Sequence, residues 1–265
     1  MLRIFISLIV VLLSCSAYAA GGLDRIEKSG AIRCGYVVWP PYINKDPNTG
    51  EMSGLSYEYM SALARELDLK LEWAEEVGWG NFQEGLNANR FDVMCVPVWQ
   101  SGQRARAALL TRPIYLNGLF GCSRANDKRF DKTLDSVNKP DIKIAYVEND
   151  VAQKIKESKF PLSSSYALPE FSDPSHVVLS VATGKADVSL CDLDNLDAFN
   201  KNNKTKLKAI AGQTPIRSFA SVMAVKKGES DLKFMLDSAI DALEISGEAQ
   251  SIVAPYAPTF MPYKQ

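Results

Sequence analysis

A run of apolar residues leads into a polar loop at Phe91-Asp92-Val93-Met94-Cys95-Val96-Pro97-Val98-Trp99-Gln100-Ser101-Gly102-Gln103-Arg104. The part up to Val98 is short and rich in valine, which is typical of a strand that is buried on both faces. The loop that follows places the hydroxyl of Ser101 and the guanidinium of Arg104 directly after this strand. Because ligands of open α/β sheets bind beside the carboxyl ends of strands, we expect this loop to belong to a binding site.

Strands and helices alternate on both sides of this segment. Apolar or alternating runs predict further strands over 31–38, 69–73, 142–147, 186–191 and 221–225. The spacing of apolar residues predicts helices over 56–67, 81–87 and about 230–246. This alternation is typical of parallel sheets covered by helices on both faces, and its two similar passages indicate two lobes.

Capping residues mark several of the expected helix ends, since a short polar side chain accepts a hydrogen bond from a free backbone N–H. The expected caps are Asn149 or Asp150 for one helix, Asp173 before Pro174 for the next, and Ser230 or Asp231 for the last. Gly184 and Gly247 are expected to end two of these helices.

Four segments follow expected strands and therefore lie at the edge of a sheet where ligands bind. They are residues 39–42, 97–104, 147–151 and 191–194. Pro40 and Pro41 exclude both helix and regular strand pairing from the first segment. We expect the four segments to face a cleft between the lobes, which is the default place for a ligand.

The composition is that of an ordinary globular protein. The chain has 265 residues, 46% of them hydrophobic and 23% charged, and its formal net charge is -1. Disordered chains contain fewer apolar residues, and nucleic-acid-binding proteins carry a basic excess, so we expect no nucleic-acid partner. His176 is the only histidine. A Cys/His zinc cluster or a Ser-His-Asp site is therefore not indicated, and we expect no metal and no cofactor.

The first residues predict a secretory signal peptide. Arg3 supplies a positive charge, residues 4–13 are almost all apolar, and Ala17-Tyr18-Ala19 has the small residues of a cleavage site. We expect removal of residues 1–19. Leu12-Leu13-Ser14-Cys15 also resembles a lipoprotein box, so lipidation of Cys15 is an open alternative. No later apolar run reaches the roughly 20 residues that span a bilayer.

Four cysteines follow the expected cleavage site, namely Cys34, Cys95, Cys122 and Cys191. An oxidising compartment permits disulfides among them, and four cysteines allow three connectivities. Three of the four lie in apolar runs, so buried unpaired thiols are an equal alternative. The sequence leaves the pairing open.

Several motifs recur in an order and spacing that resemble one family. The matching motifs are Ile32-Arg33-Cys34-Gly35, Trp39-Pro40-Pro41-Tyr42, Gly54-Leu55-Ser56-Tyr57-Glu58, Phe91-Asp92-Val93, Ser101-Gly102-Gln103-Arg104, Leu110-Thr111-Arg112-Pro113-Ile114-Tyr115, Gly184-Lys185-Ala186-Asp187 with Asp192, and Val225-Lys226-Lys227-Gly228. Together they resemble extracellular solute-binding protein family 3, the periplasmic amino-acid receptors of ABC importers.

The resemblance implies an α/β fold of the type II periplasmic binding protein class. In that fold each of two lobes has a mainly parallel sheet flanked by helices, and two crossovers join the lobes at a hinge. Lobe 1 is expected to comprise residues 20–122 and 222–265, and lobe 2 residues 123–221. The implied function is that of a monomeric periplasmic receptor. It traps a small polar ligand by hinge closure and delivers it to an ABC permease in the inner membrane.

The resemblance also implies ligand contacts that agree with charge chemistry. Arg104 can hold a carboxylate through two parallel hydrogen bonds, with the Ser101 hydroxyl beside it. Asp192 matches the position that binds the ligand's ammonium group, while Trp39 and Trp79 match two stacking positions. The alternatives are a surface arginine, a solvated acidic loop and ordinary core packing, respectively.

Two departures from the family pattern change the expected ligand. Asn149-Asp150-Val151 replaces a Gly-x-Thr that helps to hold the ligand's carboxylate, and Asp150 would repel that group. Trp99 stands where a small hydroxyl residue is common, and it would shrink the pocket. Tryptophans together with two carboxylates suit a cation. We therefore expect a basic or modified amino acid, or another small amine, in preference to glutamate.

Two other functions use the same fold. An enzyme similar to cyclohexadienyl dehydratase would need a general acid or base, for which Glu148, Asp150 and Asp192 are the candidates. A ligand-sensing module that works with a separate sensor is the other alternative. No nucleophile motif or metal cluster indicates catalysis, so we expect a binding protein and not an enzyme.

Overall fold

The structure is a computed structural model that describes residues 21–130, 133–148, 150–169, 172, 175–210, 215–256 and 260–262. The predicted signal peptide with Cys15, and the predicted caps Asn149 and Asp173 with Pro174, lie outside the described residues. Among the described residues, no helix is long and apolar enough to cross a membrane.

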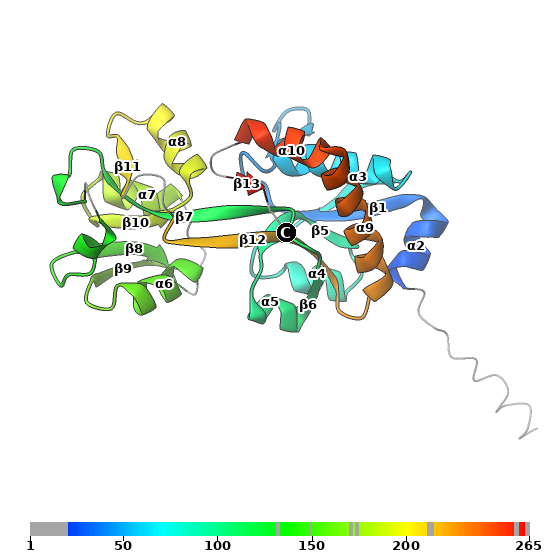
Figure 1. The fold of residues 1–265 in the computed structure, drawn as a ribbon, viewed down its shortest axis with the longest axis horizontal. Helices are drawn as coiled ribbons and strands as arrows, with labels where there is room; N and C mark the ends of the chain where they lie inside the picture. Colours follow the sequence, from blue (N-terminus) through cyan, green and yellow to red (C-terminus); the bar gives the residue numbers. More distant parts are fainter. Residues whose placement is uncertain are drawn as a thin grey trace, which may run out of the picture.

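Two lobes lie side by side and are bridged by two long strands, β7 and β12 (Figure 1). The sheet of lobe 1 has the order β4 (Lys70–Glu76), β1 (Ala31–Tyr36), β5 (Val93–Trp99) and β12 (Arg217–Lys226), and β6 (Ala108–Leu110) also pairs with β12. Strand β1 is parallel to β4 and β5, whereas β12 is antiparallel to β5. The buried strand expected over 91–98 is thus confirmed as β5, at the centre of lobe 1.

Helices cover both faces of the lobe 1 sheet (Figure 1). They are α2 (Gly22–Ser29), α3 (Leu55–Glu66), α4 (Phe82–Asn87), α5 (Gly102–Ala107), α9 (Ser230–Ser246) and α10 (Glu248–Val253), with the short helix η3 (Ala254–Tyr256). A small hairpin of β2 (Asn44–Lys45) and β3 (Met52–Ser53) precedes α3. The cap expected for α9 at Ser230 or Asp231 is wrong, because Glu229 is the N-cap residue and makes no side-chain capping bond. Gly247 ends α9 with φ 80°, as expected.

Lobe 2 repeats the arrangement on a smaller scale. Its sheet has the order β7 (Tyr115–Arg124), β10 (Val188–Cys191), β8 (Lys143–Val147) and β9 (Ser164–Leu168), and β11 (Leu207–Ala209) pairs with β7. Strands β10, β8 and β9 are parallel to one another, and β9 forms the edge of the sheet. The helices are α6 (Val151–Lys159), α7 (Ser175–Ala182) and α8 (Leu193–Asn202), with η1 (Lys128–Phe130) and η2 (Leu134–Val137). Separate apolar clusters fill lobe 1 and the two sides of the lobe 2 sheet.

The two crossover strands form the hinge. Residues 115–119 of β7 pair with residues 217–221 of β12, after which β7 joins β10 in lobe 2 and β12 joins β5 in lobe 1. A short last strand, β13 (Phe260–Pro262), pairs with β7 at residues 115–117 and so adds a third strand beside the hinge. The lobe boundaries predicted at 122/123 and 221/222 fall inside these two strands and remain predictions.

Two disulfides each lie within one lobe. Cys34 on β1 is bonded to Cys95 on β5, and Cys122 on β7 is bonded to Cys191 on β10. All four residues are buried. Of the three possible connectivities, the structure has the one in which each disulfide joins two paired strands. The alternative of unpaired thiols is wrong.

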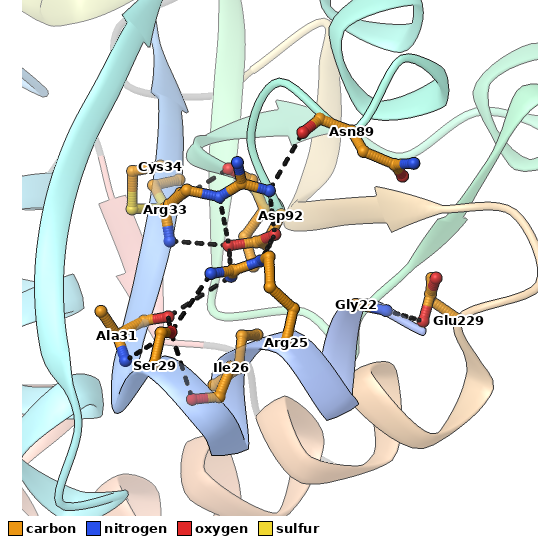
Figure 2. A network of polar contacts seen from close by, with 12 residues as sticks. Gly22, Arg25, Ile26, Ser29, Ala31, Arg33, Cys34, Asn89, Asp92 and Glu229 are labelled. Atoms are coloured by element: carbon orange, nitrogen blue, oxygen red, sulfur yellow. Dashed lines mark hydrogen bonds and ion pairs between the residues drawn. A yellow bond between two sulfur atoms is a disulfide. The ribbon is translucent and has the colours of Figure 1, made fainter. Parts of the chain in front are cut away.

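A charged network fixes the amino end of β5 (Figure 2). Asp92 is 6% exposed and lies directly before this strand. Its carboxylate accepts hydrogen bonds from the Arg25 side chain of α2, and from both the backbone N–H (2.8 Å) and the side chain of Arg33 on β1. This network joins α2, β1 and β5 near the amino ends of the two strands. The opposite, carboxyl ends form the edge at which we expect a ligand to bind.

Candidate functional site

The four segments expected at the binding edge each begin where a strand ends. Strand β1 ends at Tyr36, β5 at Trp99, β8 at Val147 and β10 at Cys191. Each is at least partly parallel to a neighbour, so these carboxyl ends lie at one edge of each sheet. The two lobes contribute two segments each.

Arg104 lies in α5, directly after the central strand of lobe 1. Ser101 caps this short helix, because its hydroxyl oxygen accepts a hydrogen bond from the Arg104 N–H at 3.2 Å. The Arg104 side chain folds back, and its Nη1 donates to the carbonyl oxygen of Trp99 at 2.7 Å. Arg104 is half-buried. Burial lowers the pKa of its guanidinium, and the carboxylate of Asp150 opposes that shift.

Asp150 belongs to lobe 2 and caps α6. Its carboxylate accepts a hydrogen bond from the Val151 N–H at 2.6 Å, which confirms the expected capping role. Asp150 is exposed at the rim, but protein atoms crowd its carboxylate and strip part of its hydration. This desolvation raises the pKa of Asp150, while the Val151 N–H and the Arg104 guanidinium oppose the shift.

The two lobes touch one another near Arg104 and Asp150. The Nζ of Lys154, one turn after Asp150 in α6, lies 3.4 Å from the Oε1 of Gln103, the neighbour of Arg104 in α5. Figure 1 shows α5 and α6 on the same side of the molecule, one in each lobe. Contact between these side chains, together with the Arg104–Asp150 attraction, shows that the start of α6 faces the start of α5.

Trp99 lies at the carboxyl end of β5 and contacts both crossover strands. Its ring stacks on Phe219 of β12, with ring centroids 4.5 Å apart and an interplanar angle of 7°. Its indole Nε1 donates to the Oδ1 of Asn117 on β7 at 3.3 Å. Both crossover strands therefore hold this ring.

Asn117 is a residue that our sequence reasoning missed. It is 1% exposed, and besides Trp99 it accepts a hydrogen bond from the Ser221 hydroxyl at 2.7 Å. Its Nδ2 donates to the hydroxyl oxygen of Tyr42 at 2.8 Å. A single amide thus connects both crossover strands with two aromatic residues of the expected binding loops. The available signal was an amide in the otherwise apolar run 114–120.

Trp39 and Trp79 lie next to one another in lobe 1. Their ring centroids are 6.0 Å apart with an interplanar angle of 74°, an edge-to-face contact. Both rings are partly buried against the lobe 1 core. The packing role is therefore present for both rings, and stacking on a ligand remains a prediction.

Asp192 follows β10 and caps α8 in lobe 2. Its carboxylate accepts hydrogen bonds from the backbone N–H of Asn195 at 2.8 Å and from the Asn195 Nδ2 at 3.0 Å. Asp192 is 8% exposed, so the alternative of a solvated acidic loop is wrong for this residue. Burial raises the pKa of its carboxyl group, and the Asn195 hydrogen bonds oppose that shift.

Within the described part of the chain, no group of three or more His, Cys, Asp or Glu side chains is arranged for an ion. His176 is exposed on α7.

Comparisons with known proteins agree with this architecture. Residues 32–259 match the model of the bacterial extracellular solute-binding proteins, family 3. The L-arginine-binding protein of Pseudomonas aeruginosa is 22% identical over 253 residues, which cover 93% of this chain and 95% of that protein.

Two solved structures have the same fold. The ancestral amino acid-binding protein AncCDT-1, described as a precursor of cyclohexadienyl dehydratase, superposes with a TM-score of 0.73 at 20% identity, covering 89% of this chain and 99% of that one. A putative binding component of an ABC transporter from Wolinella succinogenes, complexed with lysine, gives a TM-score of 0.73 at 19% identity, covering 85% and 95%. The family model spans nearly all of the described chain, and two lobes joined by two crossover strands agree with it. The chain belongs to the bacterial extracellular solute-binding proteins, family 3.

Proposed function

We propose that the protein is the receptor of an importer, which captures an amino acid or a related amine between its lobes. The observation that carries this proposal is that α5 of lobe 1, which contains Arg104, faces the start of α6 of lobe 2, which Asp150 caps, with the Nζ of Lys154 3.4 Å from the Oε1 of Gln103. A polar ligand between these groups stabilises closure by contacting both lobes at once. The proposed ligand-contacting residues are Trp39, Trp79, Trp99, Ser101, Arg104, Asp150 and Asp192.

A positively charged ligand fits this set best. Asp150 and Asp192 both place a carboxylate at the start of a lobe 2 helix, and tryptophan faces attract cations. The named ligands of similar proteins, arginine for the Pseudomonas relative and lysine for the Wolinella structure, support this preference.

The proposed activity is binding without chemistry. Both carboxylates with raised pKa values, Asp150 and Asp192, are fixed as helix caps by backbone N–H groups. Such a capping role accounts for the position of both carboxylates without a catalytic function. We further propose that the protein acts as a monomer in the periplasm and delivers its ligand to an ABC permease in the inner membrane.

A thermal-shift screen tests the proposal. The purified protein is heated with amino acids, polyamines, small amines and cyclic acids in turn. Ligand at 100 times its Kd adds about 2.7 kcal/mol to the free energy of unfolding, which corresponds to a rise in Tm of roughly 5–10 °C for a chain of this size. We expect such a rise with a basic amino acid or an amine.

Variants locate the site. Arg104→Ala and Asp192→Asn should abolish the rise, and the asparagine at 192 keeps a capping oxygen for α8. Arg106→Ala is the matched control, since Arg106 is an exposed arginine in the same helix and should leave the rise unchanged. A rise with cyclic acids alone, or none with any amino acid or amine, would contradict the proposed function.

A further inference from the structure

We propose that Asn117 is a positioning residue of the binding site, which fixes the rings of Trp99 and Tyr42 to the crossover strands before a ligand arrives. This inference rests on the proposed function, because that function makes the two segments that carry these rings part of the site. A binding site whose side chains are held in advance binds more tightly, since less of it has to be ordered when the ligand enters.

The chemistry of its partners determines which way the Asn117 amide faces. An indole N–H can only donate a hydrogen bond, so the atom that the Trp99 Nε1 contacts at 3.3 Å must be the amide oxygen. The same oxygen accepts the Ser221 hydroxyl at 2.7 Å. The amide nitrogen therefore faces Tyr42 and donates to its hydroxyl oxygen at 2.8 Å. Asn117 and Ser221 are each 1% exposed, so bulk water does not compete for these bonds.

Trp99 is held by two kinds of contact, and only one of them sets its exact position. Its ring lies flat on Phe219, with centroids 4.5 Å apart and an interplanar angle of 7°. Such a stack resists tilting of the ring, but it permits sliding and rotation within the plane of contact. The hydrogen bond from Nε1 to Asn117 removes that freedom. Asn117 therefore selects one position of the indole on the Phe219 ring.

Tyr42 extends the same control to the loop that follows β1. Its backbone N–H donates to the Trp39 carbonyl oxygen at 2.8 Å, and its own carbonyl oxygen accepts the N–H of Ser56 at the start of α3 at 2.9 Å. Its hydroxyl oxygen is bonded to Asn117 on β7. The loop that carries Trp39 is thus joined to the same amide as Trp99. Both aromatic segments of lobe 1 keep a fixed position relative to the hinge strand.

Nuclear magnetic resonance of the indole groups tests the inference on the unmodified protein. The chain has four tryptophans, and labelling them with ¹⁵N gives one indole N–H signal each; Trp99→Phe identifies the signal of Trp99. Among the residues that the structure describes, the indole N–H groups of Trp39 and Trp79 have no hydrogen-bond acceptor, whereas that of Trp99 has Asn117. We expect the Trp99 N–H to exchange with solvent at least about ten-fold more slowly than those of Trp39 and Trp79. Equal exchange rates overturn the inference.

Two variants separate positioning from stability. Asn117→Leu keeps a similar volume and removes both ring contacts. Ser221→Ala is the matched control, because it removes a hydrogen bond to the same amide oxygen and leaves the bonds to Trp99 and Tyr42 in place. We expect Asn117→Leu to shift the Trp99 indole signal and to speed its exchange by about ten-fold or more, whereas Ser221→Ala lowers Tm without either effect. A signal that moves equally in both variants, or in neither, overturns the inference. If Asn117→Leu does not fold, the exchange rates of the unmodified protein decide.

Ligand affinity measures the consequence for binding. Isothermal titration calorimetry with L-arginine and L-lysine compares both variants with the unmodified protein. We expect Asn117→Leu to weaken binding by about ten-fold or more, and Ser221→Ala to stay within about two-fold. Equal affinities in all three proteins overturn the positioning role. If neither amino acid binds the unmodified protein, the expected preference for basic amino acids is wrong, and the indole measurements decide this inference separately.

Discussion

Asp92 shows how much of lobe 1 can depend on a single side chain. Two arginines, Arg25 and Arg33, converge on its buried carboxylate, and a backbone N–H of β1 also donates to it. Removal of this buried carboxylate is costly, because two partly buried arginines and a backbone N–H lose their shared partner. The network therefore stabilises the fold, at the opposite ends of the strands from the binding edge.

Asp92→Ala is expected to lower the free energy of unfolding by about 3 kcal/mol, the lower end of the cost of breaking a buried charged set, because Arg25 and Arg33 are only partly buried. Urea titration followed by circular dichroism measures the change. Glu248→Gln is the control, because Glu248 pairs with Arg65 on the surface, where both side chains are well exposed; its effect should stay within about 1 kcal/mol. A loss of less than 1 kcal/mol in Asp92→Ala would show that the network is not stabilising.

Single residues also show where sequence reasoning reaches its limit. The capping role of Asp150 was predictable, because capping is a local property of a polar residue and the helix that follows it. The partners of Trp99 were not, since Phe219 and Asn117 come from strands that are distant in sequence. The ligand contacts proposed for Trp39, Arg104 and Asp192 still await measurement.

At the scale of elements, the positions of most strands and helices along the chain were predictable from the sequence, but the pairing between strands was not. Apolar runs located β5 and β8 to within two residues at each end, because burial on both faces leaves a continuous signal. The cap of α9 was misplaced, although its apolar face and its terminal Gly247 were recognised. Strand β13 was missed because three residues at a chain end carry no periodic pattern.

Disulfides give the elements of each lobe a covalent tie. Cys34 and Cys95 are 61 residues apart in the sequence, and Cys122 and Cys191 are 69 residues apart. Closing loops of this length restricts the unfolded chain, which stabilises the folded state by up to about 4 kcal/mol per bond. Since each bond lies within a single lobe, neither restrains the motion of one lobe against the other.

Removal of either bond is therefore expected to reduce stability. The double variants Cys34→Ala/Cys95→Ala and Cys122→Ala/Cys191→Ala should each lower Tm by roughly 10 °C in scanning calorimetry, given about 2–4 °C per kcal/mol for a chain of this size. Ligand affinity should change little in both variants if folding is retained. Four free thiols in the denatured, unreduced protein would contradict the disulfides themselves.

At the scale of the whole molecule, the strand pairings define where the lobes can move. Strand β7 is held by lobe 1 through β13 up to residue 117, and by lobe 2 through β10 from residue 120. We therefore predict that bending between the lobes is confined to Gly118 and Leu119 on this strand, opposite residues 217 and 218 of β12. Because Asn117 borders this point and holds Trp99, the hinge and the cleft are physically connected.

Gly118 is the position at which a small change should alter this motion. A Cβ atom there would lie 2.7 Å from the ring of Phe120 and 3.1 Å from Pro215, so Gly118→Ala forces the chain around the hinge to shift. Overpacking of this kind costs about 1–3 kcal/mol, and we expect it to disturb the closed arrangement in which Gln103 meets Lys154. Small-angle X-ray scattering of the protein without added ligand should show a larger radius of gyration for the variant.

Gly121→Ala provides the matched control on the same strand. Its Cβ would lie 3.3 Å or more from the flexible side chains of Leu134, Ile210 and Ile216, all of which belong to lobe 2. The added methyl group is thus accommodated within one lobe, and the radius of gyration should equal that of the unmodified protein. If Gly118→Ala gives the same scattering as Gly121→Ala, bending is not confined to residues 118 and 119. Closure must then use residues of β12 that lie outside the paired ribbon.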